Sequence, residues 1–159
     1  MDAKYLIFSI FFSLVFCFNQ VYGETIYGKA KVIDGDTIHI GNNKIRLHGI
    51  DAPEKEQKCI EDGRKWSCGM ESTRFLKKLI NNYKIQCDTK GQDKYNRYIG
   101  VCYKDTIDIN SEMVINGWAI AYRYYSLDYI KEENLAKSKK VGIWNGEFEE
   151  PYLFRKKNK

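Results

Sequence analysis

The stretch IRLHGIDAPE, residues 45–54, places a charged side chain inside a strand pattern and two carboxylates just beyond it. Arg46 alternates with apolar neighbours, and successive side chains of a strand point to opposite faces. The apolar neighbours are therefore expected in a core, with the guanidinium on the other face. Asp51 and Glu54 follow where the strand meets solvent. The stretch predicts one polar site, at the end of a strand, that combines an arginine with two carboxylates.

The segments around this stretch predict short strands first and helices later. Residues 25–50 nearly alternate, with DGD and GNN turn signals between three strands. The pattern then predicts an amphipathic helix at 69–82, strands at 84–89 and 97–103, and helices at 111–116 and 127–141. This order favours an α+β fold, a five-stranded OB-type Greek-key β-barrel with about three α-helices. A generic α+β sandwich is the alternative.

The first residues have the composition of an export signal. A polar start precedes the apolar run LIFSIFFSLVFCF, which is shorter than the roughly 20 residues of a membrane span. We expect residues 1–23 to be a cleaved signal peptide; an uncleaved anchor is the alternative. Residues 24–159 are expected to form one domain with a short basic C-terminal tail. The mature protein is expected to be a monomer, periplasmic or extracellular, without stable membrane association.

Export gives the cysteines a disulfide interpretation. Cys17 would leave with the signal, and an oxidising compartment would hold Cys59, Cys68, Cys87 and Cys102. The last two lie in strands that flank a loop, and a bulge-free hairpin would place them opposite each other. We favour the pairs Cys87–Cys102 and Cys59–Cys68, although sequence alone leaves the connectivity open. A zinc site is the rival, but no C-x-x-C pair and no nearby histidine supports it.

The charge of the chain is compatible with a polyanionic partner. The formal net charge of +5 would draw the protein toward nucleic acids. A solvated, lysine-rich surface explains so modest an excess equally well. The C-terminal run RKKNK is interpreted as a free tail rather than a nucleic-acid contact.

The charged residues at the predicted strand ends fit the chemistry of phosphodiester cleavage when they are taken together. The carboxylates are those of Asp36, Asp51 and Glu54, and the guanidinium groups are those of Arg46 and Arg97. Two aspartates can hold a hard divalent cation, and a third carboxylate can deprotonate a water molecule. Arginines bind phosphoryl oxygens through charge-assisted hydrogen bonds. Taken singly, each residue has a structural explanation as part of a turn, a strand end or a surface.

Three blocks, KVIDGDTIHI, IRLHGIDAPE and DKYNR, resemble in this order the signature of the staphylococcal nuclease (thermonuclease) family. GWAIAYRYY and KKVGIW resemble its C-terminal part, so the resemblance covers essentially the whole mature chain. It implies an OB barrel with three helices and calcium-dependent cleavage of DNA and RNA to products bearing 3′-phosphates. A catalytically inactive OB-fold nucleic-acid-binding module is the main alternative. An envelope protein that binds protein or glycan is a third.

The resemblance also implies a role for each motif residue. Asp36, Asp51 and the backbone carbonyl of Ala52 would hold Ca²⁺. Glu54 would activate or position the attacking water. Arg46 would bind the scissile phosphate, and Arg97 would stabilise its developing charge and the leaving oxygen.

Other positions resemble the family less closely. Similarity suggests nucleotide contacts, with packing roles as the alternative for the tyrosines, at Lys94, Tyr95, Tyr122 and Tyr124. His39 and His48 match no family role and are interpreted as surface residues. Asn96 stands where the family more often has glycine, and Asn tolerates a positive φ better than most residues. Ala52 replaces the more familiar threonine, and the segment after Glu54 differs from the type member.

Overall fold

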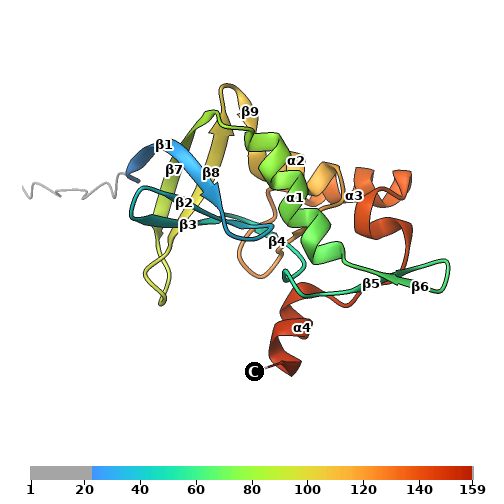
Figure 1. The fold of residues 1–159 in the computed structure, drawn as a ribbon. Coiled ribbons are helices and arrows are strands. Elements are labelled where there is room, and N and C mark those ends of the chain that lie inside the picture. Colours follow the sequence, from blue (N-terminus) through green and yellow to red (C-terminus); the bar gives the residue numbers. More distant parts are fainter. Residues whose placement is uncertain (1–22, 159) are drawn as a thin grey trace, which may run out of the picture.

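Five strands close into a barrel in the computed structural model, which describes residues 23–158 (Figure 1). They are β1 (Thr25–Val32), β2 (Thr37–Ile40), β3 (Asn43–Leu47), β7 (Lys84–Gln92) and β8 (Tyr98–Lys104). Neighbours in the order β3-β2-β1-β7-β8 pair antiparallel, and β3 also pairs with β8 in parallel, which closes the barrel. The predicted OB-type α+β fold is confirmed. The predicted signal peptide, apart from its last residue, lies outside the described residues.

Short strands extend the structure beyond the barrel. The pairs are β4 (Ile50–Asp51) with β10 (Ile120–Ala121), β5 (Cys59–Glu61) with β6 (Arg64–Trp66), and β9 (Ile107–Asp108) with β8. The sequence did not predict these strands, because segments of two or three residues carry no readable alternation. The β4–β10 pair is the important one for the site, since it fixes the end of the IRLHGIDAPE stretch.

The helices lie mostly to one side of the barrel. Figure 1 shows α1 (Cys68–Ile80), α2 (Ile109–Ile115) and α3 (Ile130–Lys139) together there, followed by the 3-10 turn η1 (Gly142–Asn145). A fourth helix, α4 (Pro151–Lys157), stands apart at the lower edge. The prediction of a free basic tail is therefore wrong, because most of that run belongs to α4. Proline at the first turn favours a helix start there, since its missing N–H is unpaired in any case.

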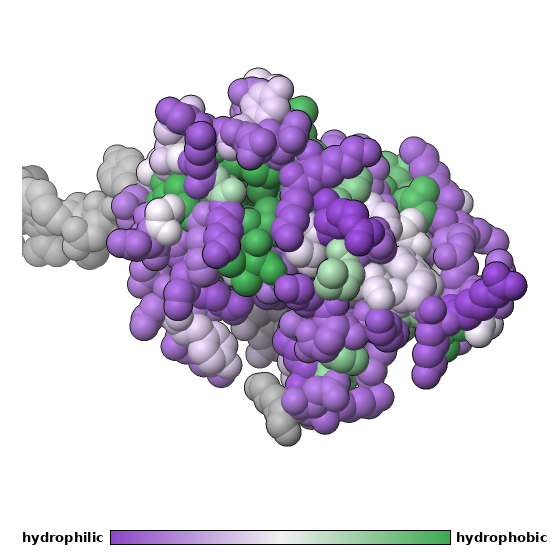
Figure 2. Space-filling model, in the orientation of Figure 1, coloured by the Kyte–Doolittle hydropathy of each residue, from purple (hydrophilic) through white to green (hydrophobic). Residues whose placement is uncertain are grey.

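The core follows the alternation that the sequence predicted. Ile45 and Leu47 of β3 are fully buried in the barrel with Ile38, Ile85 and Leu76. A second, smaller cluster joins the β5–β6 hairpin to η1 through Cys59, Cys68, Ile120 and Ile143. Figure 2 shows mainly hydrophilic residues on the visible face, with apolar side chains in limited patches. Among residues 23–158, none of the helices has the length and apolar character needed to cross a membrane.

Two disulfides confirm the predicted pairing. Cys59 is bonded to Cys68, and Cys87 is bonded to Cys102. The second pair is directly opposite in the β7–β8 ladder, because the bulge of β7 lies farther along, between Thr89 and Gln92. All four cysteines are thus used, and the rival zinc interpretation is wrong.

Candidate active site

Arg46 joins the two aspartates that the sequence singled out. Its Nη1 donates to Asp36 Oδ1 at 2.8 Å, and its Nη2 donates to Asp51 Oδ1 at 2.7 Å. Asp36 lies just before β2 and Asp51 lies in β4, so residues from two separate turns meet at one guanidinium. Both carboxylates are buried, and a buried charge is tolerated only when it is paired.

The local structure holds Asp36 in place from three directions. Its backbone carbonyl accepts from Leu47 N at 2.8 Å, which ties the turn before β2 to the end of β3. Its Oδ1 accepts from the Thr37 hydroxyl at 3.0 Å, and its Oδ2 accepts from the Ala52 N–H at 3.1 Å. Ala52 therefore contacts the cluster through its backbone amide, and the expected metal contact of its carbonyl stays a prediction.

Arg155 belongs to this cluster and was missed by sequence reasoning. It reaches from α4 into the same cluster, where Nη1 donates to Asp51 Oδ1 at 2.8 Å and to Glu54 Oε1 at 2.8 Å. Its Nη2 donates to Asp51 Oδ2 at 3.1 Å. The guanidinium thus brings Glu54 into one group with the aspartates. Its position in a basic run gave no signal of this contact, which spans a sequence separation of 101 residues to Glu54.

Burial and charge set the protonation of the cluster. Burial raises the pKa of Asp51, and hydrogen bonding from Arg155 opposes that shift. Burial and the neighbouring Asp36 raise the pKa of Asp34 to about 6. Burial lowers the pKa of Arg46, but Asp36 and Asp51 outweigh it and raise that pKa overall. Burial also lowers the pKa of Arg155, but its hydrogen bonds and ion pairs with Asp51 and Glu54 outweigh it and raise that pKa overall. Both arginines therefore remain cations.

A cleft of about 580 Å³ adjoins the cluster and receives most of the other predicted residues. Its cationic side chains are Arg46, Lys90, Lys94 and Arg97, and its tyrosines are Tyr95, Tyr122 and Tyr125. Arg97 contacts Asp93, through Nε at 2.8 Å and Nη2 at 2.7 Å to the same Oδ2. The structure therefore brings Arg97 into one cleft with Arg46, with its guanidinium paired to Asp93.

The model of the staphylococcal nuclease homologue family matches residues 44–146. The chain belongs to this family. Residues 44–146 include all the predicted site residues except Asp36, and they do not include α4 with Arg155. Both Asp36 and Arg155 thus lie outside the matched residues.

Three relatives are between 31% and 37% identical to the chain. The chain is 34% identical over 128 residues to the succinoglycan biosynthesis protein ExoI of Rhizobium meliloti (78% of this chain, 67% of that protein). It is 37% identical over 121 residues to an uncharacterized endonuclease of Haemophilus influenzae (72% and 63%). It is 31% identical over 150 residues to a micrococcal nuclease of Shigella flexneri (81% and 79%). The match thus spans less than two thirds of the Haemophilus protein.

The tyrosines at 122, 124 and 125 differ in whether they line the cleft. Tyr122 lines the cleft, whereas Tyr124 is 80% exposed and is not part of the cleft lining. Tyr125 lines the cleft instead, with its ring centroid 5.2 Å from that of Tyr122 and 4.9 Å from that of Tyr124. Asn96 adopts a φ of 57°, so the asparagine does take the left-handed conformation of the β7–β8 turn.

His48 is more enclosed than the sequence indicated. Its side chain is 12% exposed, lines the cleft, and places Nε2 3.4 Å from Asp128 Oδ2. Burial and the nearby Lys90 lower the pKa of His48, although Asp128 opposes the shift. His48 is thus a half-buried residue of the cleft wall rather than a freely exposed one.

The carboxylate cluster has the donor chemistry of a hard cation site. Asp36, Asp51 and Glu54 supply oxygen atoms, which Ca²⁺ prefers, and two of them converge on the cationic Nη1 of Arg155. A positive charge is thus held at the point where these oxygens meet. Within residues 23–158, no group of three or more His, Cys, Asp or Glu side chains is close enough to hold a metal ion as it stands. The donor types therefore suit a hard cation, while the guanidinium groups of Arg46 and Arg155 pair with the carboxylates in this structure.

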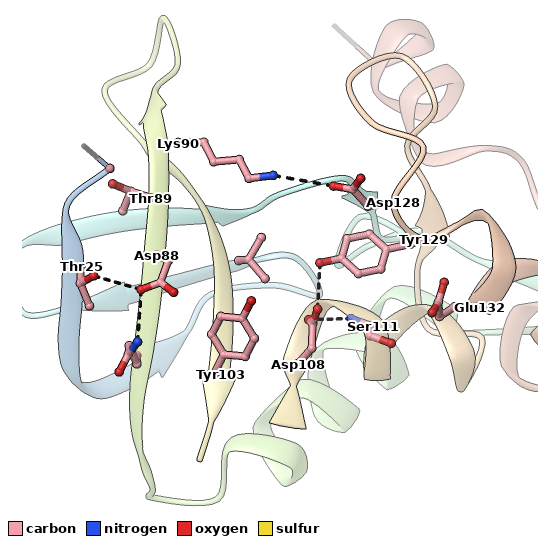
Figure 3. Close-up of a pocket in the computed structure, with 13 residues that line it drawn as sticks. Thr25, Asp88, Thr89, Lys90, Tyr103, Asp108, Ser111, Asp128, Tyr129 and Glu132 are labelled. Atoms are coloured by element: carbon pink, nitrogen blue, oxygen red, sulfur yellow. Dashed lines mark hydrogen bonds and ion pairs between the residues drawn. The ribbon is translucent and has the colours of Figure 1, made fainter. Parts of the chain in front are cut away.

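A second cavity, of about 900 Å³, lies between β7, β8 and the segment that enters α3 (Figure 3). Its acidic side chains are Asp88, Asp108, Asp128 and Glu132. Asp108 accepts from Ser111 N and from the Tyr129 hydroxyl, and Asp88 accepts from the Thr25 hydroxyl. These two carboxylates thus serve local structure, and an acidic lining disfavours nucleic acid. The basic cleft is the better nucleic-acid surface.

Proposed function

We propose that this protein is a calcium-dependent nuclease that hydrolyses phosphodiester bonds of DNA, RNA or both and leaves 3′-phosphate ends. One observation carries the proposal: Asp36, Asp51 and Glu54 gather around guanidinium groups beside a cleft lined by cations and tyrosines. The names of the Haemophilus and Shigella relatives, endonuclease and micrococcal nuclease, support the same chemistry.

Each side chain has a role in this proposal that its surroundings permit. Arg46 uses Nη1 and Nη2 for the aspartates, and a guanidinium has five N–H groups, so donors remain for a phosphate in the cleft that it lines. Glu54 is 26% exposed, which lets its carboxylate contact a water molecule and act as a general base. Arg97, in the same cleft, would stabilise the charge that develops on the phosphate and the leaving oxygen.

The metal site of the proposal consists of Asp36, Asp51 and the backbone carbonyl of Ala52. Bound Ca²⁺ would act as a Lewis acid toward the phosphate and would orient the attacking water. The tyrosines of the cleft offer faces on which unpaired bases can stack, and the lysines offer charge to the backbone.

Cleavage assays with and without metal test the proposal. The mature chain is incubated with plasmid DNA, single-stranded DNA and RNA, in Ca²⁺ or in a calcium chelator. Cleavage is expected in Ca²⁺ and not in the chelator. The new ends should accept polymerase extension only after phosphatase treatment. Equal cleavage in the chelator would refute the metal requirement. Retarded DNA on a gel without any cleavage would favour the inactive nucleic-acid-binding module.

The two disulfides indicate an oxidising environment. We further propose export to the periplasm or the exterior, by a signal peptide at residues 1–23 and without stable membrane association afterwards. We propose that the mature protein acts as a monomer.

A further inference from the structure

We propose that α4 is an autoinhibitory latch, in which Arg155 binds both oxygens of Asp51, a proposed calcium ligand, and leaves when Ca²⁺ binds. The inference rests on the calcium dependence proposed above, and it adds a regulatory segment that lies outside the residues matched by the family model.

Arg155 contacts the proposed calcium ligand Asp51 and the neighbouring Glu54, but not Asp36. Its Nη1 lies between Asp51 Oδ1 and Glu54 Oε1, at 2.8 Å from each, and its Nη2 contacts Asp51 Oδ2. Both oxygens of Asp51 are thus engaged. Ca²⁺ binds carboxylate oxygens at about 2.3 to 2.6 Å, so it and the guanidinium compete for the same oxygens and repel each other. Arg46 bridges Asp36 and Asp51, but it contacts only Oδ1 of each and leaves the second oxygen of both carboxylates free of its guanidinium.

The docking of α4 is weak enough to be reversed. Pro151 is its one buried residue among those described, and Tyr152 and Leu153 remain 47% and 43% exposed. A helix of seven residues is marginal without tertiary contacts. The ion pairs of Arg155 therefore account for much of its attachment.

An anchor for the latch lies just before α4. Gln57 Nε2 donates to the Glu149 carbonyl at 2.7 Å. This bond fixes the chain just before α4 to residues 52–58, the loop between β4 and β5 that carries Glu54 (the Glu54 loop). A cleft of about 250 Å³, lined by Glu54, Phe154 and Arg155, opens this junction to solvent. An ion can thus approach the cluster from this side, and α4 can swing away without unfolding the barrel.

Matched variants separate competition at the site from a general charge effect. Arg155→Gln removes the guanidinium, and Lys156→Gln removes the same charge from the next, exposed residue of α4. Calcium binding is measured by titration calorimetry on metal-free protein without nucleic acid. We expect Arg155→Gln to bind Ca²⁺ about tenfold more tightly than the wild type, a typical allosteric coupling. Lys156→Gln should match the wild type.

Hydrogen exchange on the wild-type protein gives a second readout that needs no variant. Calcium should speed the exchange of the amides at 151–157 while the barrel strands stay protected. Equal calcium affinity in all three proteins, or unchanged or increased protection of α4 in Ca²⁺, would overturn the latch. If one of these results is obtained and the wild type still cleaves DNA in Ca²⁺, the latch is refuted and the proposed function stands. If no protein binds Ca²⁺, both the latch and the metal requirement fail.

Discussion

Glu54 differs from the aspartates of the cluster in its access to solvent. Its side chain is 26% exposed, whereas that of Asp51 is fully buried. Asp51 is also held by two guanidinium groups, while Glu54 has a contact with Arg155 only through Oε1. Glu54 is therefore the carboxylate best able to exchange a proton with a water molecule.

Replacement of Glu54 tests this distinction. Glu54→Gln preserves shape but removes the base, and we expect cleavage of DNA in Ca²⁺ to fall about 100-fold or more. Binding to DNA and the urea midpoint should stay near those of the wild type. The control is Glu56→Gln, an exposed carboxylate of the same loop. Equal cleavage by Glu54→Gln and the wild type would show that Glu54 is not the base.

Sequence reasoning reached the residues whose position is dictated by strand ends. Asp36, Arg46 and Asp51 each stand beside a turn or within a short alternating run, so local patterns place them at one end of the barrel. Arg155 could not be found in this way, because its contacts depend on where a distant helix packs. Basic residues near a terminus are also usually solvated, which favoured the wrong interpretation.

At the scale of elements, α1 supports the Glu54 loop through one close approach. A Cβ added at Gly69, in the first turn of α1, would lie 1.7 Å from the carbonyl oxygen of Glu54. The same loop is closed by hydrogen bonds between Glu54 and Gln57. The absence of a side chain at Gly69 thus allows the helix to hold the loop that carries Glu54 in position.

Gly69→Ala should reverse the ordinary effect of alanine in a helix. Helix propensity alone would favour alanine over glycine by about 1 kcal/mol. The clash with the Glu54 carbonyl should outweigh this gain and leave a net loss of about 1 to 3 kcal/mol in the free energy of unfolding. Cleavage should fall as well, because Glu54 is displaced. Urea unfolding and cleavage rates measure both effects. Met70→Ala, at a partly exposed neighbour, is the control; a stabilised and fully active Gly69→Ala would contradict the argument.

The strength of each pattern decided which elements were predictable. The barrel strands and α1 alternate or recur over many residues, so their existence and order were confirmed. For α3, the predicted range of 127–141 was longer than the observed Ile130–Lys139, because its apolar stripe is thin. The β5–β6 hairpin and α4 are too short for a periodic signal and are held by a disulfide and by ion pairs.

At the scale of the whole molecule, the disulfides brace the two parts that flank the site. Cys87–Cys102 links β7 to β8 inside the barrel, and Cys59–Cys68 links the β5–β6 hairpin to the start of α1. The barrel and the hairpin are thus each closed by a covalent bond. Together with the parallel β3–β8 pairing, these bonds fix the frame on which the carboxylates and arginines lie.

Reduction should therefore destabilise the whole molecule, and the protein should be found oxidised. Closing loops with sequence separations of 9 and 15 is worth roughly 2.5 and 3 kcal/mol by chain entropy. Their sum is comparable with the total stability of many domains, about 5 to 15 kcal/mol. We expect a thiol reductant to lower the urea midpoint strongly.

Mass spectrometry of exported protein should show a chain that starts near Glu24 and does not react with a thiol-alkylating reagent, even in denaturant. Free thiols at these cysteines, or a midpoint that reductant leaves unchanged, would contradict both the bracing role and export to an oxidising compartment.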